Sequence, residues 1–144
     1  MANKIRVFKG AGCPNLDKET LSLLVKFLEY SVKELGLEDK EIKIRLLGKS
    51  PNEPITTGAY QPMYKTISTI CDGRNLVDYC RTIAHEMVHM KQDVENRING
   101  NEQEIGGEIE NEANMVAGIV MKKFIKNILT KEDKQHLGLG TYGS

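Results

Sequence analysis

Two histidines four residues apart, His85 and His89, are the clearest sign of chemistry in this chain, and Glu86 stands beside the first of them. In a helix, residues i and i+4 lie on the same face, so both imidazoles can reach one cation. Zn²⁺ binds imidazole nitrogen at about 2.0–2.1 Å and, in catalytic sites, keeps one position open for water. Glu86 would then lie close enough to that water to act as a general base. The chain has only 3 histidines in 144 residues, so a chance match is disfavoured.

A third ligand is expected downstream, because catalytic zinc usually takes three protein ligands. The segment after Gly107 has the periodicity of a second helix. Its apolar stripe consists of Ile109, Ala113, Val116, Ala117, Val120, Phe124 and Ile128. Glu110 and Asn114 form an i,i+4 pair at the edge of this stripe. The later residue of such a pair can accept the second ring N–H of a ligating histidine.

The spacing resembles that of the gluzincin metallopeptidases, in which HExxH is followed by Glu-x-x-x-Asp/Asn on a separate helix. The matching residues are His85, Glu86, His89, Glu110 and Asn114, with Asn114 standing where aspartate is common. The resemblance covers the two metal-binding helices and extends only loosely to the region before them. It implies one Zn²⁺ held by His85, His89 and Glu110, with Glu86 as the catalytic base and Asn114 supporting a ligand histidine.

Other residues compete for the third ligand position. Glu108 and Glu112 each lie about 200° round the helix from Glu110, and we expect them to belong to a solvated acidic surface with Glu102 and Glu104. His136 is a further candidate, but it lies far along the chain in a polar segment. A metzincin pattern would need histidine where Glu95 stands and glycine where Gln92 stands. A deformylase pattern would need another context around Cys71.

The resemblance implies zinc-dependent hydrolysis of a peptide bond in a peptide or protein substrate. An oxyanion donor is expected as well, and Tyr60, Tyr64, His136 and Tyr142 are the candidates. The alternative function is a zinc-bound, catalytically silent or latent regulator that binds a peptide or protein. A purely structural zinc is disfavoured because closed sites usually have four ligands rich in cysteine. In related enzymes the edge strand of the sheet binds extended substrate, a role that either 55–60 or 64–70 would fill here.

The order of the expected helices and strands predicts an α+β fold, and the resemblance implies that this fold is a minimal zincin-like domain. We expect strands over 5–8, 41–47, 55–60 and 64–70 in a small mixed or antiparallel sheet, and an N-terminal helix between Asp17 and Gly36. The metal helix should begin after Asn75 and end near 99–100, and the glutamate helix should run to about Asn127. We expect one domain over 1–130 and a mobile C-terminal tail over 131–144.

Composition narrows the class of protein. With 20 basic and 20 acidic residues the formal charge is zero, so nothing favours a nucleic acid or a membrane surface as partner. No apolar leader or transmembrane run is seen. Cys13, Cys71 and Cys80 lack metal-type spacing and are expected to be reduced thiols of a cytoplasmic protein. A less favoured alternative is that Cys13 caps the zinc of a latent enzyme. Oligomeric state is not predicted.

Overall fold

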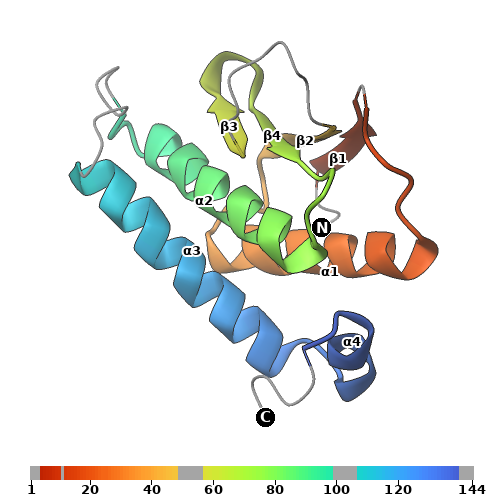
Figure 1. Ribbon diagram of the computed structural model, residues 1–144. Coiled ribbons are helices and arrows are strands. Elements are labelled where there is room, and N and C mark those ends of the chain that lie inside the picture. The colour runs from red at the N-terminus through yellow and green to blue at the C-terminus, as the bar shows by residue number, and fades with distance from the viewer. Residues whose placement is uncertain (1–3, 11, 49–56, 99–106, 140–144) are drawn as a thin grey trace.

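The protein has a mixed four-stranded sheet with helices packed on one side. The structure is a computed structural model, which describes residues 4–10, 12–48, 57–98 and 107–139. Figure 1 shows the sheet above α1, with α2 and α3 running side by side and α4 next to the C-terminal end of α3. In chain order the elements are β1 (Lys4–Lys9), α1 (Lys18–Glu34), β2 (Glu41–Leu47), β3 (Gly58–Gln61), the short 3₁₀ helix η1 (Pro62–Tyr64), β4 (Thr66–Ile70), α2 (Leu76–Val94), α3 (Glu108–Asn127) and α4 (Lys131–His136). The predicted α+β class is confirmed.

The strand order is β1-β2-β4-β3. The first three strands are parallel, and β3 pairs antiparallel with β4. Side chains of β2 alternate between buried and exposed, which is the pattern of a sheet covered on one face only. The buried positions of this strand are Ile42, Ile44 and Leu46, and they join side chains of α1, α2 and α3 in one hydrophobic core.

Helix starts follow the caps expected from the sequence. The Asp17 carboxylate accepts a hydrogen bond from the Thr20 N–H at 2.7 Å, and the Asn75 side chain accepts one from the Asp78 N–H at 3.0 Å. These contacts satisfy backbone donors that a helix otherwise leaves unpaired at its first turn. Both predicted N-termini are therefore confirmed.

The end of α2 differs from the expectation of 99–100. Asn96 adopts a left-handed conformation with φ of 59°, and the helix stops at Val94. The Arg97 N–H donates to the Gln92 carbonyl at 2.9 Å and the Asn96 N–H to the Asp93 carbonyl at 3.0 Å, the two bonds of a Schellman motif. The sequence analysis missed this turn because asparagine is a less specific sign of a helix end than glycine.

The C-terminal segment also differs from the expected tail. Residues 131–136 form α4, which begins with a capping box between Thr130 and Asp133. Asp133 also pairs with Lys26 of α1 at 3.1 Å, and Leu137 and Leu139 pack against the core. A tail was expected because the segment is polar, but capping and a long-range ion pair stabilise a short helix there. Residues 140–144 lie outside the described residues.

Candidate metal centre

The two histidines and Glu86 project from the middle of α2, where the helix packs on the sheet and on α3. Buried apolar residues of α2 hold it in place, among them Ile83, Ala84 and Met87. His85 and His89 lie one turn apart, with ring centroids 4.8 Å from each other and ring planes at 82°. Their side chains are 17% and 13% exposed, so both can be reached from solvent while most of each ring is covered.

Glu110 of α3 lies directly opposite the two rings. One carboxylate oxygen is 2.7 Å from His85 Nε2, and the other is 3.0 Å from His89 Nε2. One ligand atom from each of these three residues lies within 4.8 Å of the other two. In the described part of the chain, these are the only His, Cys, Asp and Glu side chains that meet in this way.

This donor set fits a metal ion. Zn²⁺ binds nitrogen and oxygen ligands at about 2.0–2.2 Å, which places tetrahedral ligands about 3.4 Å apart. The observed contacts are slightly shorter, so small outward shifts of the side chains would admit a cation. Two imidazoles and one carboxylate also leave room for the open coordination position of a catalytic site. The three residues can therefore bind a metal ion.

Glu86 lies at the rim of this cluster and is not one of the three donors. Its carboxylate is 3.9 Å from His85 Nε2, and its side chain is 13% exposed. Burial raises the pKa of Glu86, the nearby histidines counteract this, and the Glu110 carboxylate adds to the increase. A carboxylate made more basic in this way is better suited to accept a proton.

Gln92, which the sequence analysis did not single out, contacts a ligand histidine. Its Oε1 is 2.8 Å from His89 Nδ1, and the residue is fully buried. This is the role expected of Asn114, whose side chain is exposed and makes no hydrogen bond to either histidine in the described chain. Asn114, one turn beyond Glu110, is exposed, and the contact to His89 comes instead from α2 itself. A polar residue at i+3 from His89, on the buried face of the helix, was the available signal.

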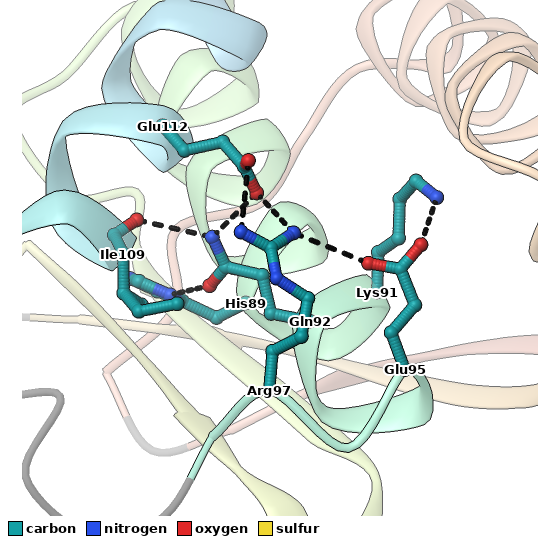
Figure 2. A network of polar contacts seen from close by, with 7 residues as sticks. All are labelled: His89, Lys91, Gln92, Glu95, Arg97, Ile109 and Glu112. Atoms are coloured by element: carbon teal, nitrogen blue, oxygen red, sulfur yellow. Dashed lines mark hydrogen bonds and ion pairs between the residues drawn. The ribbon is translucent and has the colours of Figure 1, made fainter.

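Glu112 was expected to belong to a solvated acidic surface, but in the structure it has specific partners. Its carboxylate accepts hydrogen bonds from Gln92 Nε2 at 2.9 Å and from both Arg97 Nη atoms at 2.8 and 3.0 Å (Figure 2). Arg97 reaches it because the Schellman turn redirects the chain at the end of α2. Glu108, at the start of α3, is exposed as predicted. Glu102 and Glu104 lie outside the described residues.

The remaining candidates do not join the cluster. His136 Nδ1 is 2.8 Å from Glu19 of α1, so the histidine of α4 belongs to the contact between those helices. The Tyr60 hydroxyl donates to Asp93 at 2.7 Å, and Tyr64 is exposed in η1. Tyr142 lies outside the described residues. None of these positions identifies an oxyanion donor.

The three cysteines are free thiols. Cys71 and Cys80 are buried, and Cys13 is partly buried with its Sγ 3.3 Å from the Pro14 carbonyl. Burial raises the pKa of Cys71 to about 12, so its thiol is unreactive at neutral pH. Cys13 is not among the residues of the metal cluster.

Strand β3 is the sheet edge nearest the cluster. Of the two ranges considered in the sequence analysis, 55–60 is therefore the one that overlaps this edge strand. The strand lies against α2 so closely that a Cβ on Gly58 would overlap the Thr82 methyl group and lie 3.7 Å from Glu86 Cγ. The Ile70 N–H donates to the Thr57 carbonyl at 3.0 Å. Because antiparallel pairing alternates, the main-chain groups of Gly58 and Tyr60 point away from β4.

Comparison with known proteins found no match: no family model, no curated protein and no solved structure matches the chain. The interpretation of this centre therefore depends on its geometry. No helix in the described ranges is long and apolar enough to cross a membrane.

Proposed function

We propose that this protein is a zinc-dependent peptidase. The observation that carries the proposal is the position of Glu86, a partly buried carboxylate beside a three-residue donor set to which it does not belong. A purely structural metal site has no use for such a group, whereas hydrolysis needs a base next to the attacking water. His85, His89 and Glu110 would hold the ion.

When bound, Zn²⁺ lowers the pKa of its water toward about 7 and polarises the scissile carbonyl. Glu86 accepts a proton from the attacking water and returns it to the leaving amine. Its proximity to His85 keeps the carboxylate within reach of the reacting atoms. The outward main-chain groups of β3 bind the peptide in an extended conformation beside Glu86, which is a general means of holding a chain with modest side-chain selection.

The Glu86→Gln variant tests this function. Glutamine preserves the size of the side chain but cannot accept the proton, so Zn²⁺ content should stay unchanged while cleavage of casein or a peptide library falls by about 10²–10⁴-fold. Metal content is measured by mass spectrometry, and cleavage is measured with and without a chelator.

The matched control is Glu29→Gln, which makes the same change at an exposed position of α1 and should leave both readings unaltered. Full cleavage by Glu86→Gln would exclude the mechanism. A zinc-loaded wild-type protein without any peptidase activity would favour the regulator instead.

A further inference from the structure

Gln92 lies at the centre of a network of polar contacts that joins the metal centre to the end of α2. Figure 2 shows His89, Gln92, Glu112 and Arg97 linked in series, with Ile109 of α3 beside them. Gln92 is fully buried, yet both its amide hydrogens and its carbonyl oxygen have partners. A buried amide with every group satisfied has only one favourable orientation.

The partners determine that orientation. Gln92 Nε2 is 3.0 Å from the Ile109 carbonyl oxygen and 2.9 Å from Glu112 Oε1. A carbonyl can only accept, and the Glu112 carboxylate also accepts, because both Arg97 Nη atoms donate to it at 2.8 and 3.0 Å. The amide nitrogen must therefore face α3, and the amide oxygen must face His89.

The same reasoning extends to the imidazole. Gln92 Oε1 is an acceptor, so His89 Nδ1, at 2.8 Å, must carry a hydrogen. The nitrogen left to bind a cation is Nε2, which is the one that faces Glu110. Arg97 donates to Glu112, Glu112 accepts from Gln92 Nε2, and Gln92 Oε1 accepts from His89 Nδ1. Each hydrogen bond in this series therefore determines the direction of the next one.

We infer that Gln92, held by the Arg97–Glu112 ion pair, is a positioning residue that selects the Nδ1–H form of His89 and aims its Nε2 at the metal. The inference depends on the metal centre of the proposed function but not on peptide hydrolysis. Groups that orient a ligand histidine in this way typically contribute 10–100-fold to metal affinity.

The test uses the full chain loaded with Zn²⁺ and ¹⁵N-labelled at histidine, which gives few ring signals because the chain has 3 histidines. In the wild-type protein the His89 ring should show a slowly exchanging Nδ1–H and a metal-bound Nε2. Gln92→Met, which keeps the length but removes the acceptor, should make that Nδ1–H exchange rapidly and weaken Zn²⁺ binding by about 10–100-fold.

Two further variants separate positioning from packing. The control Gln135→Met makes the same change on exposed α4 and should alter neither reading. Gln92→Glu restores an acceptor for His89 but opposes the Glu112 carboxylate, and combining it with Glu112→Gln provides a donor again. The double variant should therefore recover the slow Nδ1–H but only part of the affinity, because the Ile109 carbonyl then faces a carboxylate oxygen in place of an amide donor.

The inference is overturned if Gln92→Met binds Zn²⁺ within twofold of wild type with an unchanged His89 signal. It is also overturned if the folded double variant regains neither reading. A wild-type chain that does not bind Zn²⁺ would overturn both this inference and the proposed function. Loss of peptidase activity alone, with the ring signals as expected, would count only against the function. If Gln92→Met does not fold, Glu112→Ala must show the faster exchange.

Discussion

At the scale of single residues, Glu110 is the group that brings α3 into the metal centre. Its two carboxylate oxygens contact the two imidazoles separately, at 2.7 and 3.0 Å. Glu110→Ala should therefore weaken Zn²⁺ binding by at least about 10-fold, since outer-shell changes alone cost 10–100-fold and Glu110 would bind directly. Titration with a competing chelator measures the change.

The control for this variant is Glu108→Ala. Glu108 lies on the same helix, is exposed and is not one of the three donors, so its removal should leave Zn²⁺ affinity unchanged. Equal losses in both variants would show that the third ligand is assigned wrongly.

The contrast between Glu110 and Gln92 shows what sequence could predict at this scale. Glu110 was predicted from the resemblance to the Glu-x-x-x-Asp/Asn pattern and from its place at the edge of an apolar stripe, both of which are local properties of the sequence. The role of Gln92 depends on where Ile109 and Glu112 lie after α2 packs on α3, and local spacing does not contain that information. Asn114 was chosen from the same local spacing, and in the structure its side chain is exposed on α3.

At the scale of elements, the fit of β3 on α2 depends on a missing side chain at Gly58. A Cβ there would overlap the Thr82 methyl group and lie 3.0 Å from the Ser68 carbonyl oxygen. Thr82 cannot rotate freely, because its hydroxyl accepts a hydrogen bond from Arg74 at 2.8 Å. Gly58→Ala should therefore displace β3 and lower stability by about 1–3 kcal/mol. Urea unfolding measures the change, and peptide cleavage should fall while Zn²⁺ stays bound.

Gly118→Ala is the matched control, because nothing lies within 4 Å of the added carbon on α3. Alanine in a helix interior should raise stability by about 0.5–1 kcal/mol over glycine. A destabilised Gly118→Ala, or a Gly58→Ala that unfolds like wild type, would contradict this account of the packing.

Element types were predicted better than their ends and pairing. Strand β2 matches its predicted span because alternation of apolar and polar residues marks both its ends. The strand order could not be predicted, since local patterns do not say which strands are neighbours. The predicted range 55–60 contains all of the observed edge strand except its last residue, Gln61. The end of α2 depended on Asn96 adopting a left-handed conformation, which few residue types identify in advance.

At the scale of the whole molecule, the C-terminal helix and the metal centre are separate. Helix α4 contacts α1 through Lys26 and Glu19, whereas the ligands come from α2 and α3 (Figure 1). Asp133→Ala removes both the capping contact to the Thr130 N–H and the partner of Lys26. It should lower stability by about 1 kcal/mol without changing Zn²⁺ affinity, as thermal unfolding and metal titration would show.

The variant Lys131→Ala serves as a comparison, because it changes an exposed residue of the same helix and leaves the cap intact. A loss of Zn²⁺ affinity in Asp133→Ala alone would indicate that α4 influences the metal centre after all.

The contacts of Glu110 have a final consequence for how the protein would respond to its surroundings. Each imidazole presents to that carboxylate the same nitrogen that a cation would occupy. Hydrogen ions and metal ions therefore compete for one small space, and uptake of the metal must be accompanied by release of acid into the medium. The affinity of the protein for its ion would therefore fall as the solution is acidified.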